Sequence, residues 1–545
     1  MIRIIFLYIN TIKYLSIKQV VYRIIYHFFQ VKFTINTFHG FSKKLKNKNK
    51  NWIIKNIPFP KSNNFQFLNS SHKVLKFSFK KELPKLWLYN LHYFDYIITK
   101  EGLCNVKRSK KLIYNWVFAE KYNLKIGLEP YPTSLRIVNW IKWLIFTGVE
   151  DNKLNNIILS QTKFLSKQIE WHIMANHLIA NAKALLFSGV YFSCKEASGF
   201  RKLGEKILKQ EIKEQILDDG GHFERSPMYH SIIIEDLLDI VELNRLFPNC
   251  IDIILIEKIE DVIHKQVLWL NTMLHTDKEI SFFNDSSIGV AQSPKNILMF
   301  YNVLFKKNIT FKNYEKLSFE YLKNTGYCSI GAKTYKCLID IGSVGPSYQP
   351  GHSHAQTFSF ELSIWGTRVF VNTGVSEYNE GERRELERGT KAHNTVSCFN
   401  KNSSDVWSSF RVANRAKVSN INIIKKNNVI KISGRHDGYK NILNNAYHER
   451  KWEFKKNTIR IQDNVKHGKN IMATLILHPN AKLIKNIDNS FVIKLKNKKT
   501  ISLWFNVENV QIKDWQYASQ FGKLLNTKCL HIFSNKDVIE TYINW

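Results

Sequence analysis

The sequence lacks the features that mark several large classes of protein. Its seven cysteines are scattered and form no CxxC pair, so neither a disulfide framework nor a zinc site built on thiolates is indicated. It has no glycine-rich phosphate-binding loop and no nucleic-acid-binding motif. Acidic residues are also few, because 45 Asp and Glu stand against 80 Lys and Arg and leave a formal charge of +35.

The basic excess fits a polyanionic partner, which would be nucleic acid, an anionic membrane surface or an acidic polysaccharide. Lysine, asparagine and isoleucine are all abundant. A compositional bias acting on the whole chain would therefore produce the same excess without any ligand. Because no nucleic-acid motif accompanies the basic residues, we do not expect nucleic acid to be a partner.

A clean apolar run is missing from the N-terminus. Residues 1–29 are apolar but are interrupted by Arg3, Lys13, Lys18 and Arg23, and no small-residue cleavage site follows them. They make a poor signal peptide and a poor membrane span. Their spacing favours an amphipathic helix, which we expect to pack on the protein, with peripheral membrane contact as the alternative. Without an export signal we expect a cytoplasmic or membrane-associated protein.

The chain is long enough for two large cores, and its pattern changes twice. Residues 1–84 hold the N-terminal helix, a polar solvated linker at 43–51 and short extended segments. Residues 85–315 show helical spacing with short polar breaks, and residues 316–545 show short β-rich runs divided by turns. Helices followed by strands predict an α+β protein with two consecutive large domains. The predicted helices are 112–121, 134–147, 153–168, 172–190, 200–217, 231–247 and 256–274.

Polar residues are densest between 351 and 394, where three of the eighteen histidines surround one predicted hairpin. Alternation from His354 to Ile364 predicts a strand, followed by a turn and a return strand that ends at Asn372. His352 and His354 would then point the same way, about 6.6 Å apart along the strand. A single histidine is most often a satisfied core or surface residue. Three around one hairpin indicate a shared site.

Several motifs occur in a characteristic order. They are EPYPTSLRIVNWIKWL from Glu129, ANHLIANAKALL from Ala175, DDGGHFERSPMYH from Asp218, FFNDSS from Phe282, GHSHAQTFSFEL from Gly351 with NTG and AHNTV after it, HDGY from His436 and LHP from Leu477. Over about residues 85–540 the chain resembles the heparinase II/III-like family of polysaccharide lyases and their relatives in bacterial surface-polysaccharide gene clusters. The resemblance implies an incomplete α/α toroid followed by an antiparallel β-sandwich.

The resemblance also implies a reaction, the β-elimination of an acidic, uronic-acid-containing polysaccharide. The C5 proton of a uronic acid is weakly acidic, so the enzyme must withdraw charge from the adjacent carboxylate and place a base near the carbon. Asn176 matches the residue that binds this carboxylate, with His177 beside it. Tyr229 matches the proton donor to the leaving O4, which in one stereochemical course acts first as the base. His352 matches the second proton-transfer residue, and a neighbouring cation such as Arg225 would lower the pKa of Tyr229.

Taken alone, each of these residues is also explained by a role in packing. An asparagine inside a predicted helix is a packing amide, and a lone tyrosine is a packing residue with a wet tip. Two further functions therefore stay open. A uronyl C5-epimerase removes the same proton and returns one to the opposite face, and a non-catalytic glycan-binding factor in surface-polysaccharide synthesis needs no reaction at all.

A structural metal is a further implication of the resemblance. His354 and His393 match positions that bind a metal, usually zinc, in relatives, together with an aspartate on the returning strand. Asn372 stands in place of that aspartate, and a neutral amide is a poorer zinc ligand than a carboxylate. Glu377 or Glu380 would be a substitute ligand. Without metal, the two histidines would brace the hairpin through hydrogen bonds.

Tyr131, Arg136 and Arg388 are candidates for holding the polyanion, together with His177 and Arg225. A guanidinium group binds carboxylate or sulfate in a bidentate manner. Each arginine has a structural alternative as an ion-pair partner. Asp285, in the FFNDSS motif, is expected to support the cleft and not to be a reacting group.

Overall fold

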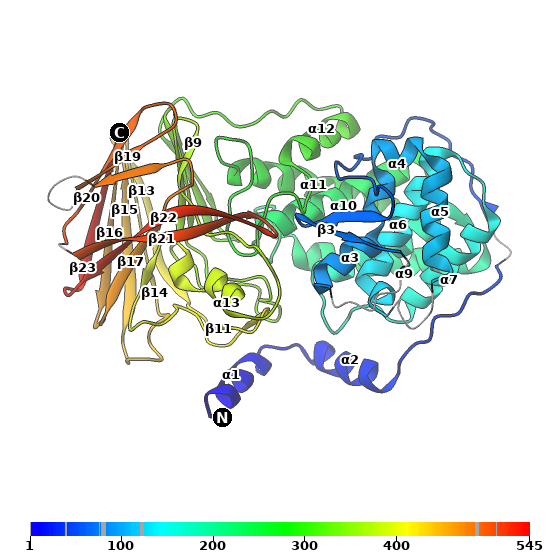
Figure 1. Cartoon of the computed structure of the whole chain (residues 1–545), viewed down its shortest axis with the longest axis horizontal. Coiled ribbons are helices and arrows are strands. Elements are labelled where there is room, and N and C mark those ends of the chain that lie inside the picture. Colours follow the sequence, from blue (N-terminus) through cyan, green and yellow to red (C-terminus); the bar gives the residue numbers. More distant parts are fainter. Residues whose placement is uncertain are drawn as a thin grey trace.

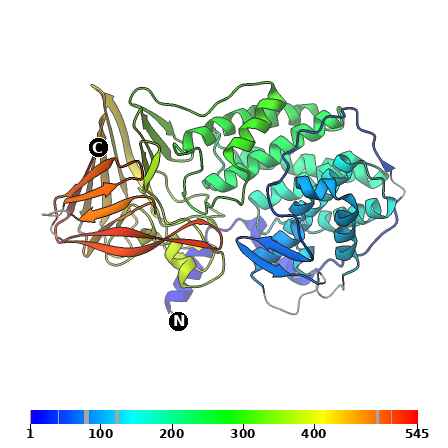
Figure 2. The same ribbon diagram turned by 45° about the horizontal axis from the view of Figure 1, so that its top comes forward.

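The computed structural model describes residues 2–38, 41–75, 77, 83–119, 125–485, 490–507 and 509–545. Helices and strands segregate into two bodies that lie side by side (Figure 1). The N-terminal helices run along one side of both bodies, and the same arrangement is visible after a turn of 45° (Figure 2). The expected order of a helical region followed by an antiparallel β region is therefore confirmed.

The helical body is built from consecutive helices with short connections. Each helix predicted between residues 112 and 274 overlaps a helix of the structure. Apolar residues with a period of 3.6 both predict a helix and form the face that it packs against the core. A further helix, α12, begins at Pro294 after the capping residue Ser293 and was not predicted. The elements are α3 (Lys85–Tyr93), η1 (Asp95–Ile98), α4 (Lys100–Cys104), α5 (Val106–Val117), η3 (Ile126–Leu128), α6 (Pro130–Thr147), α7 (Asn152–Ser166), α8 (Asn176–Tyr191), β4 (Phe192–Ser193), α9 (Lys195–Gln215), α10 (Pro227–Leu246), α11 (Ile253–Met273) and α12 (Pro294–Phe305).

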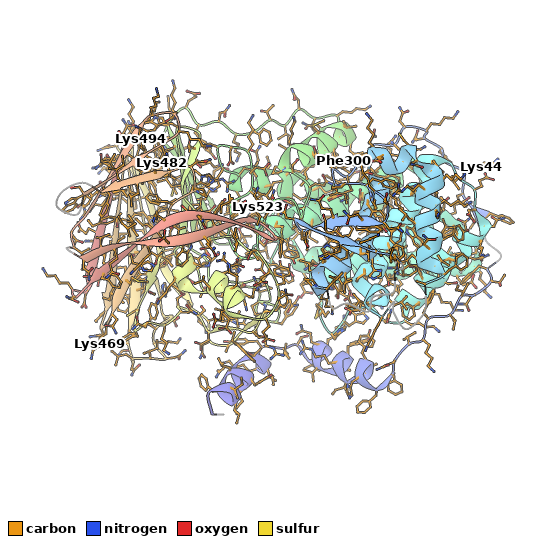
Figure 3. The ribbon with its side chains drawn as sticks, viewed as in Figure 1. Lys44, Phe300, Lys469, Lys482, Lys494 and Lys523 are labelled. Carbon is orange, nitrogen blue, oxygen red and sulfur yellow. The ribbon has the colours of Figure 1, made fainter. Side chains whose placement is uncertain are left out.

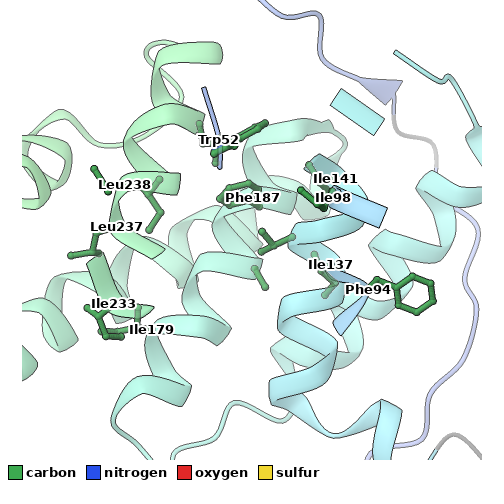
Figure 4. Packing of buried hydrophobic residues seen from close by; sticks show 14 of the residues in the cluster. Trp52, Phe94, Ile98, Ile137, Ile141, Ile179, Phe187, Ile233, Leu237 and Leu238 are labelled. Atoms are coloured by element: carbon green, nitrogen blue, oxygen red, sulfur yellow. The ribbon is translucent and has the colours of Figure 1, made fainter. Parts of the chain in front are cut away.

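The core of this body lies where α6, α8 and α10 pack on one another. Ile137 and Ile141 of α6 are four residues apart and fully buried, so both point to the same side of the helix. Phe187 of α8 and Leu237 of α10 face them, and Trp52 from the N-terminal segment completes the cluster (Figure 4). Packing of this kind fixes the positions of the helix ends that carry the site.

The N-terminal segment forms α1 (Ile2–Ile12) and α2 (Ile17–Phe28), which meet at an angle of 111° and not as one helix. α1 ends at Ile12, and Ser16 caps α2, since its hydroxyl accepts from the backbone of Gln19 while the Gln19 side chain accepts from the backbone of Ser16. Within the described residues no single helix is long and apolar enough to cross a membrane, whereas this bent pair passes that test jointly by length and composition.

Residues 41–73 connect the N-terminal helices to the helical body. The strand β1 (Phe41–Ser42) pairs with β4, and a hairpin forms from β2 (Asn64–Phe67) and β3 (Ser70–Lys73). The stretch predicted as a solvated linker lies on the helical body: the backbone of Lys43 donates to Tyr191 O at 2.8 Å, and that of Asn51 donates to the Glu242 carboxylate at 2.7 Å. Its polar composition therefore reflects hydrogen bonding to the protein as well as to water.

In the part of the chain that the structure describes, the β body contains an eight-stranded, a five-stranded and a four-stranded antiparallel sheet. Ile330 and Ile339 from the five-stranded sheet share a core with Ile432 and Trp452 from the eight-stranded sheet. The strands are β5 (Ser318–Leu322), β6 (Tyr327–Ala332), β7 (Tyr335–Asp340), β8 (Phe360–Ile364), β9 (Thr367–Phe370), β10 (Val396–Ser397), β11 (Val406–Trp407), β12 (Arg411–Val412), β13 (Val418–Lys426), β14 (Val429–His436), β15 (Tyr447–Phe454), β16 (Thr458–Lys466), β17 (Ile471–Ile476), β18 (Lys482–Lys485), β19 (Ser490–Lys494), β20 (Thr500–Phe505), β21 (Asn509–Gln520), β22 (Lys523–Ser534) and β23 (Val538–Asn544), with α13 (Glu382–Arg388) and η4 (Thr390–Ala392) inserted.

The predicted strand from His354 to Ile364 is wrong in its first half, because β8 begins only at Phe360. Polar tertiary contacts replace strand pairing there: the backbone of His354 donates to Asn284 Oδ1 at 3.1 Å, and Gln356 donates to Asp340 at 2.7 Å. His352 and His354 therefore lie on a loop and not on a strand. The predicted turn and return strand after β8 are present.

Lysines account for much of the surface. Lys469, Lys482 and Lys494 are exposed on the β body, and Lys44 lies at the opposite end of the molecule (Figure 3). The basic excess is thus spread over both bodies and does not by itself mark one binding face.

Candidate active site

Two predicted site residues lie in the first turns of neighbouring helices. Asn176 is the first residue of α8, and Tyr229 is the third residue of α10, whose capping residue Ser226 accepts a hydrogen bond from the Tyr229 backbone at 3.1 Å. The prediction that Asn176 lies inside a helix starting at His172 is wrong. The N-terminal ends of helices carry partial positive charge and free N–H groups, so this corner of the helical body favours an anion.

Backbone strain marks the approach to the site. Ala175, Arg225 and Asn284 have φ of 55°, 59° and 57° and each directly precedes a residue of the site or its helix cap. A non-glycine residue in this region costs about 1–3 kcal/mol and persists only where the surroundings enforce it. Here Asn284 Nδ2 and the Tyr327 hydroxyl both donate to Arg225 O, at 2.9 and 2.6 Å. The turns before Tyr229 and Asp285 therefore hold each other in place.

Asp285 is the centre of the site and is fully buried. It accepts hydrogen bonds from His352 Nδ1 and His354 Nε2, both at 2.8 Å. Arg384 adds a bidentate contact at 2.5 and 2.7 Å. Burial opposes ionisation, but the Arg384 charge and the two histidine bonds hold the pKa of Asp285 well below its ordinary value. The carboxylate is therefore charged at neutral pH and holds the two histidines and Arg384 in place.

The hydrogen bond to Asp285 orients His352. Because a carboxylate accepts, Nδ1 carries the hydrogen and Nε2 of the neutral ring is left as the basic atom. Among the described residues Nε2 has no hydrogen-bond partner, and 13% of the side chain is exposed. Nε2 is therefore the ring nitrogen left free for a substrate, while the buried carboxylate fixes the orientation of the ring.

The ring of Tyr229 stacks on His352 with centroids 3.9 Å apart and planes inclined by 26°. Its hydroxyl lies 3.2 Å from the hydroxyl of Tyr378. Burial, followed by the neighbouring Tyr378, raises the pKa of Tyr229 well above its ordinary value. The prediction that Arg225 lowers this pKa is wrong, because its guanidinium is turned away and donates to the backbone of Ser343. Tyr229 is therefore a proton donor at neutral pH.

Asn176 faces a buried carboxyl group. Its Nδ2 lies 3.1 Å from both carboxylate oxygens of Glu224. Burial raises the pKa of Glu224, while His352 and His177 act in the opposite direction. Glu224 therefore interacts with Asn176, His177 and His352. The Asn176 amide is thus held by the Glu224 carboxyl group at the first turn of α8.

His177 and Tyr131 form a second polar wall. The His177 ring lies 4.5 Å from that of Tyr131, centroid to centroid, and its Nδ1 is 3.0 Å from Glu170 Oε1. Burial disfavours the cation, but the Glu170 carboxylate raises the pKa of His177 overall. Both rings are half-buried, so they remain at the surface where the sequence predicted contact with substrate.

Arg136 and Arg388 do not lie where the prediction requires. Both are fully buried. Arg136 donates to Gln161 and to Gly127 O at 2.7 Å, with its guanidinium over the Trp116 ring. Arg388 donates to Ser353 O at 3.0 Å, and so fixes the loop between His352 and His354. The prediction that these two arginines contact the polyanion is wrong, because their charges are used inside the protein.

The residues expected at a structural metal do not fit one. The His354 and His393 rings are adjacent, with centroids 5.2 Å apart, but His354 Nε2 is engaged by Asp285. The Asn372 side chain accepts from Ser359 at 2.6 Å and donates to a backbone carbonyl at 3.0 Å. Within the described ranges no group of three His, Cys, Asp or Glu is placed to hold a metal ion, and this covers Glu377 and Glu380.

Both histidines of this pair are neutral. Burial lowers the pKa of His354 to about 4, against the attraction of Asp285. Burial and the neighbouring His354 lower the pKa of His393 well below its ordinary value, although the backbone of Glu387 raises it slightly. His354 Nε2 bonds Asp285, whereas neither ring nitrogen of His393 has a hydrogen-bond partner among the described residues, so hydrogen bonds from both histidines do not brace this loop.

Three residues of the site were not singled out from the sequence. Arg384 lies one helical turn before Arg388 on α13, and the spacing of four residues indicates only that both face the same way. Glu224 lies within the DDGGHFERSPMYH motif, two residues before the helix cap Ser226. An acidic residue at this position in the motif is the signal that would have identified it. Tyr378 lies in an irregular segment between β9 and α13 and has no pattern that distinguishes it.

Comparison with known proteins places this geometry in one family. Residues 146–313 match the family model described as heparinase II/III N-terminus, and residues 316–541 match the one described as heparinase II/III-like, C-terminal. A heparin-sulfate lyase of Bacteroides stercoris is 27% identical over 248 residues, which are 42% of this chain and 36% of that lyase. The chain thus aligns with little more than a third of that relative's length.

Solved structures share the fold. A crystal structure of heparinase III superimposes with a TM-score of 0.68 at 17% identity and covers 86% of this chain and 79% of its own. A variant of a heparan sulfate lyase from Pedobacter heparinus gives a TM-score of 0.62 at 17% identity, with 96% of this chain and 87% of its own covered. At this level of identity the likeness concerns the arrangement of the two bodies.

Proposed function

We propose that this chain, which belongs to the heparinase II/III-like family, is a polysaccharide lyase that cleaves a uronic-acid-containing polysaccharide by β-elimination. The observation that carries the proposal is the stack of Tyr229 on His352. One ring holds a proton firmly, and the other is oriented by a buried carboxylate to accept one. An acid and a base in contact are what proton removal at C5 and protonation of O4 require.

The uronate carboxylate binds at the first turns of α8 and α10, where the Asn176 amide and the free backbone N–H groups donate hydrogen bonds to it. These donors and the two helix ends stabilise the negative charge that spreads onto the carboxylate when the C5 proton leaves. His177, whose pKa is raised by Glu170, adds positive charge to the same wall. Withdrawal of charge in this way lowers the barrier to removing a weakly acidic C–H proton.

His352 Nε2 takes the C5 proton, and Asp285 stabilises the imidazolium. The electron pair of the C5–H bond forms the C4–C5 double bond as the C4–O4 bond breaks. Tyr229 donates its phenolic proton to the departing O4, and the Tyr378 hydroxyl 3.2 Å away provides a route for reprotonation. One product has a new reducing end with a free hydroxyl group, and the other ends in a 4,5-unsaturated uronate.

The substrate class follows from the family. The curated relative from Bacteroides stercoris is named a heparin-sulfate lyase, so we propose a glycosaminoglycan-like polyanion for this chain. The likeness of its motifs to proteins encoded with surface-polysaccharide genes makes the producing cell's own acidic polysaccharide a second member of that class. The formal charge of +35 favours association with either.

The test offers purified protein a panel of uronic-acid polysaccharides, sulfated and unsulfated, and follows the ultraviolet absorbance of the unsaturated uronate. We expect absorbance to rise with the wild type and not with Tyr229→Phe, which keeps the ring stack but has no proton to donate. The reactions are also run in deuterated water. Deuterium at C5 without any absorbance would identify an epimerase and contradict the proposal, and no change in any substrate would contradict catalysis altogether.

A further inference from the structure

The N-terminal helices have an unusual distribution of charge. Residues 1–81 contain no Asp or Glu, whereas residues 1–29 contain Arg3, Lys13, Lys18 and Arg23. Every charged side chain in this stretch is therefore basic. A segment that is apolar and carries only positive charges is attracted to an anionic surface with a nonpolar interior.

The two helices expose their apolar side chains and bury polar ones. Gln19 is fully buried and Asn10 nearly so. In contrast, Ile17 is 83% exposed, Phe28 73%, and Ile9 61%. Ile5, Ile12 and Ile24 are also exposed. A surface helix of a protein in water shows the opposite pattern, so the outer face of α1 and α2 is suited to a nonpolar environment.

Polar contacts hold the helices in this orientation. For α1, the Trp407 indole donates to Thr11 Oγ1 at 3.1 Å and Arg411 donates to the Tyr8 hydroxyl at 3.0 Å. For α2, the Tyr26 hydroxyl donates to Ile169 O at 2.5 Å, and Lys18 lies over the ring of Trp171. Thus α1 is attached to the β body and α2 to the helical body (Figures 1 and 2), and the exposed apolar side chains lie on the sides of the helices that the protein does not cover.

We propose that α1 and α2 dock on the surface of an anionic lipid bilayer, with their apolar side chains in the acyl boundary and their basic residues at the headgroups. A helix of 12 residues is about 18 Å long, whereas the hydrocarbon core is about 30 Å thick. The angle of 111° between the helices prevents them from acting as one longer rod. Short amphipathic helices with basic residues lie in the interface.

Docking also sets the position of the cleft. The backbone carbonyls of Ile169 and Ile173 accept from Tyr26 and Gln19 of α2, and the chain runs from there directly into Asn176. The bilayer therefore lies next to the segment that leads into Asn176 at the start of α8. This inference is independent of the lyase proposal, since it depends on the N-terminal helices alone.

The test is sedimentation of the full chain with vesicles. We expect binding to vesicles of phosphatidylglycerol and phosphatidylcholine, and weaker binding by about tenfold or more to phosphatidylcholine alone or at high salt. The double variant Ile17→Glu/Ile24→Glu alters one exposed face of α2, since the two positions are seven residues apart. We expect it to lose at least about tenfold in vesicle binding while keeping the melting temperature of the wild type.

The matched control is Ile253→Glu/Ile254→Glu, which places the same charges at two isoleucines of α11 that are 64% and 70% exposed. We expect this control to bind vesicles like the wild type. Equal binding by Ile17→Glu/Ile24→Glu and the wild type would overturn the proposal, as would the absence of binding to any vesicle. Protein that stays in the membrane after alkaline carbonate extraction would show insertion across the bilayer, which also overturns surface docking.

Discussion

Two clusters in this molecule are built from the same residue types, and only one of them lies at the cleft. In the cleft, Asp285 binds Arg384 and two histidines. In the core of the β body, Asp463 binds Arg450 through Nε at 2.5 Å and Nη2 at 2.9 Å. Both carboxylates are fully buried, and in both the arginine and histidine partners lower the pKa against the effect of burial.

The difference lies in what the histidine does with its second nitrogen. His448 is 2.6 Å from Asp463 and uses its other nitrogen to bond His436 at 3.0 Å, with both rings fully buried. His352 instead leaves Nε2 open and stacks on Tyr229. A buried Asp–Arg–His set is therefore a structural device, and it becomes a candidate for catalysis only where the imidazole reaches a cleft and a second proton carrier.

The largest expected effect separates the two histidines. His352→Gln removes the proposed base but keeps a polar side chain beside Asp285, so we expect kcat to fall by about 10²–10⁴-fold with little change in melting temperature. His448→Gln should show the reverse, with normal activity per folded molecule and a lower melting temperature. Lyase assays and thermal unfolding of both variants measure this, and similar losses of activity in the two would remove the distinction.

The second effect is on stability. Asp463→Ala leaves the fully buried Arg450 and His448 without their carboxylate, and breaking a buried ion pair from one side costs about 3–5 kcal/mol. Urea unfolding followed by circular dichroism measures the loss. Lys528→Ala breaks a surface pair with Asp514 whose side chains are 50% and 91% exposed, and serves as the control with little change. A loss in Asp463→Ala no larger than in this control would contradict the structural role of the core cluster.

The third effect is the acid dependence of stability. The Asp463 pKa is about 2 in the folded protein, against about 3.9 for an ordinary aspartate. Its contribution is therefore complete above pH 4 and is lost as the pH falls toward 2, and it amounts to about 2–3 kcal/mol. Asp463→Asn should reduce the slope of stability against pH in that window. Parallel slopes for the variant and the wild type would show that the pKa is not lowered.

The smallest effect concerns Tyr378. Tyr378→Phe removes the hydroxyl 3.2 Å from that of Tyr229, and loss of one hydrogen bond of this kind costs about 1 kcal/mol, or several-fold in kcat. Because this contact raises the pKa of Tyr229, its removal should also move the alkaline limb of the pH–rate profile to lower pH. A purely structural role for Tyr378 would leave that limb in place.

The features that were predicted correctly depend on neighbours in the sequence. The helices between residues 112 and 274 follow from periodic apolar residues. The predicted helix 231–247 starts four residues late, because α10 is capped by Ser226 and opens at Pro227, where the apolar spacing gives no signal. The strand proposed to start at His354 failed because its alternation competes with hydrogen bonds to Asn284 and Asp340, which are distant in the sequence.

The sequence by itself determined the order of a helical body and a β body and the family, because local spacing and motifs carry that information, and its motifs singled out Asn176, Tyr229 and His352 as candidates. Only the tertiary structure decided that Arg384, and not Arg388, binds Asp285, and that the Arg136 side chain is buried. It also decided that the apolar side of α1 and α2 points outward. Burial and the choice of charged partner depend on segments that are distant in the sequence, such as Asp285 and Arg384, which are 99 residues apart, so they exist only once the chain has folded.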